Sequence, residues 1–315
     1  MRKAFALIFI CCTINSFAQQ TKAPLFKSEV TLLVDNDNFL MNLHDGYYTN
    51  GIFLKLNTAS ETRSNKKKII RYEVGQKIFT TENRRITSTS EIDRPYTGYL
   101  YARYGHTIFS TKRVLKWSGE VGTIGPASGG RQVQELYHKA IHVYEYPGWE
   151  TQLKTEFGLN SSISYLPLIK EFNGKAFKIV PAIQANLGTT FTSVNAGTYL
   201  CIGAFENNQN SALWDAAIAG KGSEERKRGY ELFAFFYPRV IVQAYNATVQ
   251  GGLFREDKGG YVSDIKRLMY EHTIGLIYSR NRLKMQLNIA FQTKEAASQK
   301  KNHHWAGIGV THRFN

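Results

Sequence analysis

The chain has 315 residues, with 40 Lys and Arg against 25 Asp and Glu, 7 Pro and 13% aromatic residues. Few prolines and many aromatic residues exclude a disordered or collagen-like chain, and three cysteines exclude a disulfide framework. Beyond the N-terminus, charged residues interrupt every apolar run before the roughly 18 residues that a spanning helix requires, which excludes a helical membrane protein.

The N-terminus has the pattern of a secretory signal peptide rather than of a short buried helix. Arg2 and Lys3 precede an apolar run, and residues 16–18 form a small-x-small cleavage site. We expect residues 1–18 to be removed and residues 19–315 to form one exported domain, because no linker divides them. Removing Arg2 and Lys3 from the 40 basic residues leaves 38 against 25 acidic ones, a formal charge of +13. In an exported protein this excess favours a phosphorylated lipid surface over nucleic acid.

Apolar and polar residues then alternate in stretches of about ten, which is the pattern of membrane β-strands. In the clearest stretch, residues 282–291, the apolar side chains share one face, and charged or amide side chains share the other. Tyr and Phe gather at the ends of the stretches, where a membrane barrel places its aromatic girdles. The pattern predicts an all-β fold, a transmembrane antiparallel β-barrel of about 12 strands with a short helix in an outer loop. The predicted strands are 27–35, 49–57, 68–79, 97–109, 113–123, 151–165, 176–188, 193–203, 229–244, 268–280, 283–293 and 304–314.

Barrel closure constrains the strand count. Residues 247–254 are a further candidate, but the stretch is short, contains two adjacent glycines and would make the count odd, so we assign it to a loop. A soluble β-sandwich would also alternate, but it needs no aromatic ends and rarely reaches so many long strands. With both ends on the periplasmic side, the connections 36–48, 80–96 and 124–150 emerge outside. The connection 204–228 is then unusually long for a periplasmic turn.

Residues 35–38, Asp-Asn-Asp-Asn, place four oxygen-bearing side chains in succession after the first strand. Such a run suits a hard cation such as calcium, which takes about six to eight oxygen ligands. The same residue types also cap the backbone of ordinary turns. Thr49 and Asn50 open the second strand, and this places them at the barrel mouth beside the run. The residues alone leave both interpretations open.

The second outer connection carries Arg84 and Arg85, and Asp-Arg-Pro-Tyr at residues 93–96 closes it. Arg binds phosphate through paired, charge-assisted hydrogen bonds. For any one of these residues a solvated loop charge is the ordinary interpretation. The basic character of the whole chain favours a phosphate-binding role for the group.

Residues 131–142 interrupt the β pattern with helical spacing. Arg131, Gln134 and His138 recur three and four residues apart, so they should project from one face together. His138 is favoured as a catalytic residue over the other histidines, because it shares this face with Gln134 and belongs to the same group of connections as Asp37. The apolar face of the predicted helix consists of Val133, Leu136, Tyr137, Ala140 and Ile141.

Several motifs along the chain match those of one known family. They are Asn36-Asp37, Tyr48-Thr49-x-Gly51, Gly125-Pro126-x-x-Gly129-Gly130-x-x-Val133-Gln134-x-x-x-His138, and Tyr146-Pro147-x-Trp149. In this order they resemble the LpxR-type outer-membrane lipid A 3′-O-deacylases, and the resemblance covers essentially the whole mature chain. It implies a twelve-stranded barrel and a calcium-dependent esterase. Such an enzyme removes the 3′-linked acyloxyacyl group of lipid A in the outer leaflet.

The resemblance also implies roles for individual residues. His138 takes the place of the general base of the family, and Gln134 accompanies it. Asn36, Asp37 and Thr49 match the other active-site positions. We therefore expect these five residues to form the catalytic site.

Substrate and metal binding follow from the same comparison. The family has a Lys in the second outer loop, for which Arg84 and Arg85 are the nearest counterparts, so we expect these two to bind the phosphorylated sugar. A family Glu shortly after the helix falls in the column of Tyr144, with Glu145 one residue on. Asp37 and Glu145 are the predicted Ca²⁺ ligands.

The mechanism expected from these residues is direct hydrolysis. A water molecule activated by His138 attacks the ester carbonyl, while Ca²⁺ near Asp37 polarises the carbonyl oxygen. The expected partner is lipid A or lipopolysaccharide, not nucleic acid, and we expect a monomer in the bacterial outer membrane with its active-site loops facing outside. Two alternatives remain: an outer-membrane phospholipase A that uses a Ser–His pair, and a non-enzymatic barrel that serves as a channel or an adhesion scaffold.

Overall fold

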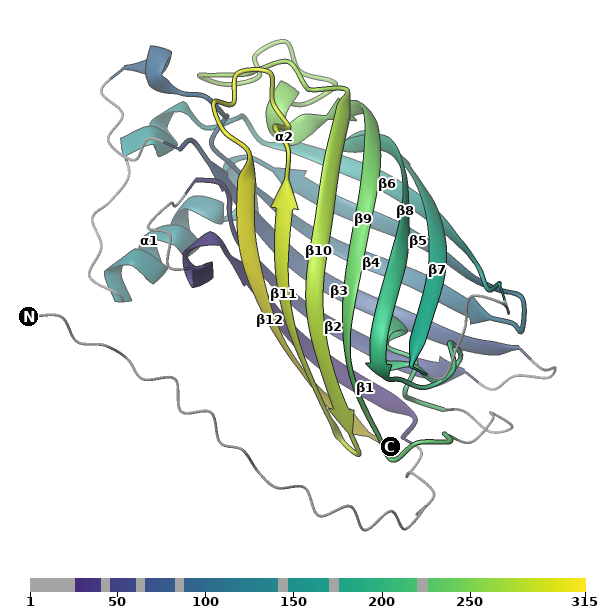
Figure 1. Ribbon diagram of the computed structural model, residues 1–315. Helices are drawn as coiled ribbons and strands as arrows, with labels where there is room; N and C mark the ends of the chain where they lie inside the picture. Colours follow the sequence, from purple (N-terminus) through teal and green to yellow (C-terminus); the bar gives the residue numbers. More distant parts are fainter. Residues whose placement is uncertain are drawn as a thin grey trace, which may run out of the picture.

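Antiparallel strands wind around a closed barrel, in which each strand pairs with the next in the chain and β1 pairs with β12 (Figure 1). The computed structural model describes residues 26–40, 46–60, 66–82, 88–140, 147–169, 176–219 and 226–315. The described strands are β1 (Ser28–Asn36), β2 (Tyr47–Ser60), β3 (Lys67–Thr80), β4 (Thr97–Phe109), β5 (Arg113–Ile124), β6 (Glu156–Pro167), β7 (Phe177–Gly188), β8 (Phe191–Ala204), β9 (Tyr230–Asn246), β10 (Leu268–Arg280), β11 (Leu283–Gln292) and β12 (His303–Phe314).

All twelve predicted strands are present, and β4 and β10 have the predicted bounds. The prediction for the sixth strand is wrong at its start, because β6 begins at Glu156 instead of at residue 151. The residues before it form the 3₁₀ helix η4 (Pro147–Thr151), and the amide of Leu153 donates to the carbonyl of Tyr96. Residues 247–254 contain no strand; their first turn is the short helix α2 (Ala247–Gln250).

The outer face of the barrel is apolar along its strands. On β11, for example, the side chains of Leu283, Met285, Leu287 and Ile289 are between 40% and 52% exposed. Lys284, between two of them, is buried on the lumen side. An apolar outer face around a polar lumen is the pattern of a barrel that crosses a membrane, as the sequence predicts. The strands therefore span the outer membrane.

Among the described residues, no helix is both long and apolar enough to cross a bilayer.

The described parts of the connections that follow odd-numbered strands lie at one end of the barrel, which we call the loop rim (Figure 1). The opposite end, the terminal rim, carries the start of β1 and the end of β12. This confirms the predicted grouping of the connections after the first, third and fifth strands. The described elements of the loop rim are η1 (Asp37–Leu40), η2 (Thr89–Glu91), η3 (Pro126–Ser128), α1 (Gly130–Ala140), η4 and α2.

The described first part of the long connection between β8 and β9 folds into the lumen at the terminal rim. Residues 205–219 of this connection, which we call the plug, include the 3₁₀ helix η6 (Ala212–Trp214). Trp214 and Ile218 are buried in a cluster with apolar side chains of several strands. The unusual length of this connection thus has a structural reason, because an ordinary turn could not fill the end of the barrel.

Ion pairs fix the plug to the barrel wall. Asp215 lies 2.5 Å from both Arg71 of β3 and Lys284 of β11. Glu231 of β9 accepts from the hydroxyl of Ser211 at 3.0 Å. Burial raises the pKa of Asp215, but Lys284 and Arg71 outweigh this effect and hold it well below its usual range. The carboxylate therefore stabilises the plug at neutral pH, and this contribution is lost only as the pH falls through the lowered pKa.

We predict that Asp215→Asn destabilises the barrel by about 3–5 kcal/mol, because it leaves two cations without their buried counter-ion. The matched control is Asp257→Asn, which breaks a surface pair with Lys154 at 3.7 Å and should cost less than about 1 kcal/mol. Urea unfolding in detergent micelles measures both. Equal stability of the two variants would show that the plug does not depend on Asp215.

Candidate functional site

The wall formed by β1 to β4 has two chemically different faces at the loop rim. Asp35, Lys77 and Tyr99 line the lumen. Successive side chains of a strand point to opposite faces, so their neighbours Ile78 and Gly98 face outward. A site at this rim can therefore lie either in the lumen or on the outer wall, and the side of each residue decides which.

Helix α1 lies against the outer face of this wall (Figure 1). A Cβ atom built on Gly98 would lie 2.2 Å from Oγ of Ser128 and 2.9 Å from Cα of Gly130, so only glycine allows this close approach. Gln76, on the outward face of β3, donates from Nε2 to the carbonyl of Ser128 at 2.6 Å. These contacts fix the start of α1 on β3 and β4.

The side of α1 that is turned inward carries the predicted catalytic residues. Gln134 and His138 are each only 5% exposed. The indole Nε1 of Trp149 in η4 donates to Oε1 of Gln134 at 2.8 Å. Trp149 itself is buried against Tyr96 and Ile78. Two parts of the β5–β6 connection, α1 and η4, thus pack together and hold Gln134 in place.

Arg131 does not join this face, contrary to the expectation from its spacing. Its guanidinium lies 2.6 Å from Glu135 and 2.7 Å from Glu150, on the more exposed side of the helix. The long Arg side chain at the first turn reaches these carboxylates and is drawn away from the direction set by its Cα position. Of the three residues that the helical spacing grouped, only Gln134 and His138 lie on the buried side of α1.

Asp37 and Thr49 meet at the start of β2. The pairing of β2 with β3 shifts between Tyr48 and Asn50, so Thr49 is the extra residue of a β-bulge. Its hydroxyl donates to Oδ1 of Asp37 at 3.5 Å, and the amide of Gly46 donates to Oδ2 at 2.8 Å. Phe53 and Lys55 line the lumen, so simple alternation would also point Thr49 into it. Because of the bulge, Tyr48 lines the lumen instead and Thr49 turns to Asp37. Asp37 and Thr49 are both buried.

The run at residues 35–38 does not act as one cluster. The carboxylate of Asp35 accepts from the hydroxyl of Tyr48 on the lumen side. Oδ1 of Asn36 accepts from the amide of Asn38 at 2.8 Å, which is the backbone capping expected of an ordinary turn. Of this run, Asp37 is the carboxylate that meets Thr49.

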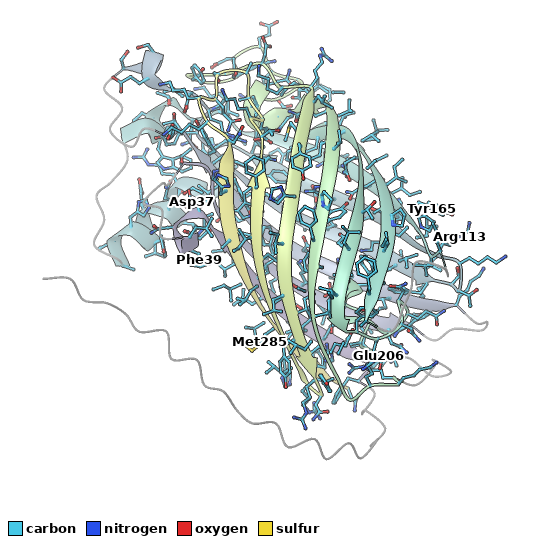
Figure 2. The ribbon with its side chains drawn as sticks, in the orientation of Figure 1. Asp37, Phe39, Arg113, Tyr165, Glu206 and Met285 are labelled. Atoms are coloured by element: carbon cyan, nitrogen blue, oxygen red, sulfur yellow. The ribbon has the colours of Figure 1, made fainter. Side chains whose placement is uncertain are left out.

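The two halves of the predicted site lie on neighbouring parts of the same wall. Helix η1, which contains Asp37, contacts β12 and β2, whereas α1 contacts β3 and β4. Figure 2 shows Asp37 and Phe39 beside this wall, outside the barrel. The structure thus brings Asp37 and Thr49 into contact and places α1, with Gln134 and His138, against the adjacent strands of the same rim. Arg84, Arg85 and Glu145, and residues 1–18, lie outside the described residues.

The donor atoms at this place are those that calcium prefers in kind. Asp37 contributes a carboxylate, and Asn36 and Thr49 contribute an amide and a hydroxyl oxygen. Within the part of the chain that the structure describes, no three His, Cys, Asp or Glu side chains form a metal-binding group. The described set therefore fits a calcium ion in ligand type and supplies only part of its coordination.

Arg94 has a structural role rather than the phosphate-binding role considered for its group. It is fully buried; its Nη2 lies 2.7 Å from Glu295, and its guanidinium lies 4.0 Å from the centre of the Phe79 ring. Burial lowers the pKa of Arg94, Glu295 opposes the shift, and the guanidinium stays charged. Sequence reasoning missed this role, and it missed Gly98, for which a glycine inside a strand was the available signal.

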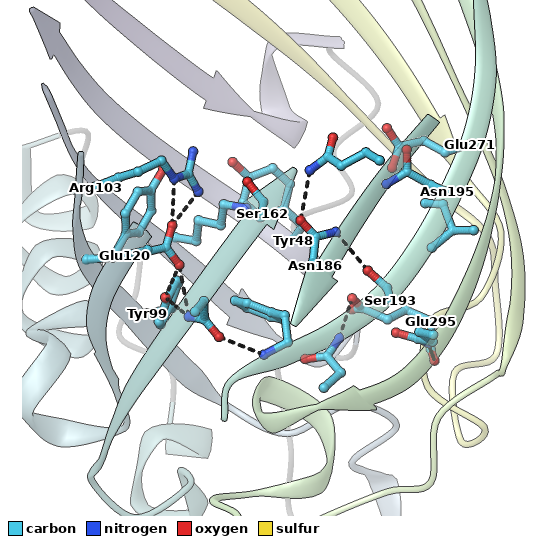
Figure 3. A pocket seen from close by; sticks show the side chains of 18 of the residues that line it. Tyr48, Tyr99, Arg103, Glu120, Ser162, Asn186, Ser193, Asn195, Glu271 and Glu295 are labelled. Carbon is cyan, nitrogen blue, oxygen red and sulfur yellow. Dashed lines mark hydrogen bonds and ion pairs between the residues drawn. The ribbon is translucent and has the colours of Figure 1, made fainter. Parts of the chain in front are cut away.

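The lumen holds a separate cavity of about 490 Å³ (Figure 3). Its polar side chains largely bind one another: Glu120 accepts from Tyr99 and pairs with Arg103, and Asn186 donates to Ser193 at 2.9 Å. None of the predicted catalytic residues lines it. The candidate site and this cavity therefore lie on opposite faces of the barrel wall.

With the fold and the site described, comparisons with known proteins identify the family. The family model of the outer membrane protein LpxR matches residues 5–314. The chain belongs to the LpxR family. The solved structure of LpxR from Salmonella typhimurium is similar to this chain with a TM-score of 0.75 and 18% identity, over 91% of this chain and 100% of that one.

More distant matches and the remaining comparison add little. The β domain of the Bordetella autotransporter BrkA has a TM-score of 0.49 and 8% identity, over 92% of this chain and 99% of that one. A comparison with curated proteins found no match. LpxR family membership confirms the resemblance seen in the motifs and supports an outer-membrane enzyme that acts on lipid A.

We predict that Gly98→Ala loosens α1 from the wall at a cost of about 1–3 kcal/mol, because the added methyl group overlaps Ser128 and Gly130. Hydrogen exchange measured by mass spectrometry should show faster exchange of the α1 amides while the strands stay protected. Gly119→Ala on β5 is the control, since the nearest atom to its added Cβ lies 4.0 Å away. Unchanged protection of α1 in Gly98→Ala would contradict the described packing.

Proposed function

We propose that this LpxR family member is an esterase that hydrolyses the 3′-O-linked acyloxyacyl chain of lipid A. The observation that carries the proposal is the position of His138 and Gln134, which are buried between α1 and the outer wall of the barrel. An ester of a membrane lipid lies at the depth of the interface, on the outside of the barrel. A site on the outer wall can receive it without moving the lipid into the lumen.

In the proposed reaction, Nε2 or Nδ1 of His138 takes a proton from a water molecule as the water oxygen bonds to the ester carbonyl carbon. The bond between this carbon and the 3′ oxygen of the sugar then breaks, and the leaving oxygen takes the proton from His138. The products are the free acyloxyacyl acid and a 3′-hydroxyl on lipid A. All atoms come from the ester and one water molecule.

Gln134 has a geometry that suits charge stabilisation. Its Oε1 already accepts from Trp149, so the N–H₂ group is the end of the amide that can donate to the substrate. A donor fixed in advance stabilises the oxyanion of the tetrahedral intermediate. Acylation of Thr49 is less favoured as a route, because it requires His138 to take the proton of a hydroxyl that donates to Asp37 instead.

We propose calcium as the cofactor, held by Asp37 with Glu145. A bound calcium ion would supply a Lewis acid beside the ester carbonyl. Thr49 donates to Asp37 and so positions its carboxylate, and Asn36, next to Asp37 in the chain, adds an oxygen donor. We assign phosphate binding to Arg84 and Arg85 and place the loop rim on the outside of the cell, where lipid A forms the outer leaflet.

The alternative of a diffusion channel is not favoured. The plug fills the lumen at the terminal rim, and the apolar cluster around Trp214 is buried there. Ion pairs of Asp215 tie the plug to β3 and β11. A polar solute would have to displace these contacts in order to cross.

We predict that His138→Ala lowers the rate of lipid A deacylation by about 10²–10⁴, the usual contribution of a general base. Mass spectrometry of lipid A from cells that express each variant measures the loss of the acyloxyacyl chain. His312→Ala, at the opposite rim, should keep full activity. The folded barrel should be retained in both, as seen from its migration before and after heating. An active His138→Ala variant would refute the assignment of the base.

We predict that a calcium chelator abolishes deacylation and that added Ca²⁺ restores it. Asp37→Asn should raise the Ca²⁺ concentration needed for half-maximal activity at least about tenfold, since a charged ligand is lost. The matched control is Asp35→Asn, which changes the carboxylate two residues away that faces the lumen. If the two variants required the same Ca²⁺ concentration, Asp37 would not be a ligand.

A further inference from the structure

The lumen cavity, which the proposed reaction does not use, has the size and the position of a ligand site. Its volume of about 490 Å³ lies within the range of about 300–1,000 Å³ that small-molecule sites occupy, and the mouths of β-barrels are a common place for them. At the terminal rim the plug fills the lumen, where Trp214 and Ile218 are buried. A ligand therefore enters and leaves at the loop rim, so the cavity can bind a solute without conducting it.

The charges around this cavity balance one another. Among the described residues, five carboxylates and four cations line it, and Arg94 adds a fifth cation 2.7 Å from Glu295. Arg239 lies 2.5 Å from Glu271, and Arg103 pairs with two more of the carboxylates. With no net charge, the cavity does not concentrate ions of either sign.

The two lysines of this set share the remaining carboxylate. Lys55 and Lys77 form no ion pair with a described residue, but the charges of both act on Asp35. The Asp35 carboxylate accepts a hydrogen bond from a neutral donor, the hydroxyl of Tyr48, at 2.9 Å. The lysines thus add hydrogen-bond donors without an excess of positive charge, and the cavity favours a neutral ligand.

Neutral polar groups with unused hydrogen-bonding capacity lie side by side on β8 and β9 (Figure 3). Asn195 is only 5% exposed, and its Oδ1 has no hydrogen-bond partner among the described residues. The hydroxyl of Ser193 accepts from Asn186 at 2.9 Å, which leaves its proton for another acceptor. Gln243, which pairs with Ser193 in the sheet, uses its Nε2 on two backbone carbonyls and keeps its Oε1. Such donors and acceptors match hydroxyl groups, which both donate and accept.

Aromatic side chains line the same cavity near the loop rim. Tyr99, Phe191 and Trp305 belong to one cluster, in which the rings of Tyr99 and Phe191 meet edge to face at 5.2 Å. The indole of Trp305 is stacked on His303, and its N–H has no hydrogen-bond partner in the part of the chain that the structure describes. A sugar ring has apolar C–H faces and an edge of hydroxyl groups. Aromatic rings beside amides and hydroxyls suit both.

We propose that the lumen cavity binds a neutral saccharide of one or two rings. Ser193, Asn195 and Gln243 would bind its hydroxyl groups, and Trp305 would contact a ring and donate from its indole N–H. The bonds that the lining side chains make with one another hold these groups in place, so binding costs little ordering. This site is separate from the candidate ester site and does not rest on the proposed function.

Calorimetric titration of the purified barrel tests the ligand class. The detergent must lack a sugar headgroup, which would compete for the cavity. The probes are glucose, maltose, glucuronate and inorganic phosphate. We expect one neutral sugar to bind per chain, glucuronate to bind less tightly and phosphate not to bind. Absence of saturable binding of both glucose and maltose would overturn the proposal, and so would tighter binding of glucuronate or phosphate.

Asn195→Leu tests the site, because it removes the amide and keeps a side chain of similar size. It should weaken binding of the neutral sugar about tenfold. Asn288→Leu is the matched control: its Oδ1 is also buried without a partner among the described residues, but Asn288 does not line the cavity. Both variants should keep the folded barrel, as seen from its migration before and after heating. Unchanged binding in Asn195→Leu, or equal weakening in both variants, would contradict the site.

A free sugar and the saccharide chain of lipopolysaccharide share this chemistry, and competition separates them. Displacement of the bound sugar by lipopolysaccharide but not by lipid A would assign the site to the saccharide chain. If neither displaces it, the ligand is a free sugar. Displacement by lipid A would contradict a site for saccharides that is separate from the outer wall.

Discussion

Successive side chains of each strand alternate between the lumen and the outer wall, and this alternation decides where polar groups can lie in this protein. In lipid, an outward polar group has no water to bind and must find a partner in the protein. At the loop rim, Gln76 faces outward, and Asp37 and Thr49 lie beside the same wall; they receive partners from η3 and from one another. Helix α1, which follows η3, lies against β3 and β4 with Gln134 and His138 buried. The segment that satisfies Gln76 thus also leads into the helix that buries His138 beside the outer wall.

The strands could be predicted from the sequence because period-two alternation is a local property, and a barrel in lipid imposes it on both faces. The start of β6 could not, since residues 151–155 were predicted to belong to the strand but follow η4, whose Trp149 donates to Gln134 of α1. Helical spacing predicted α1 but not which side faces the wall, because this depends on distant contacts such as that of Gln134 with Trp149. The motifs predicted the candidate site residues from short stretches of sequence. The supporting role of Gly98 could not be predicted, because it depends on contacts with Ser128 and Gly130, which are far away in the sequence.

The positions of the site and of the plug separate two functions of the barrel. The lumen is closed at the terminal rim by residues 205–219, and its polar groups pair with one another, so it acts as a rigid core. The outer wall carries the groups available for chemistry. In a medium of low dielectric constant, the charge that develops on a carbonyl oxygen interacts more strongly with fixed donors than it would in water. A polar site against lipid therefore combines access for a membrane lipid with strong electrostatic stabilisation.

The central claim is that the ester binds on the outer wall and not in the lumen. A crystal structure of the His138→Ala variant with lipid A and calcium tests this most directly, because the substrate should survive in that variant. The account predicts the 3′ ester between α1 and the outer faces of β2 and β3, with its acyl chains along the apolar band. Lipid A bound in the lumen cavity, or on a part of the wall away from α1, would contradict it.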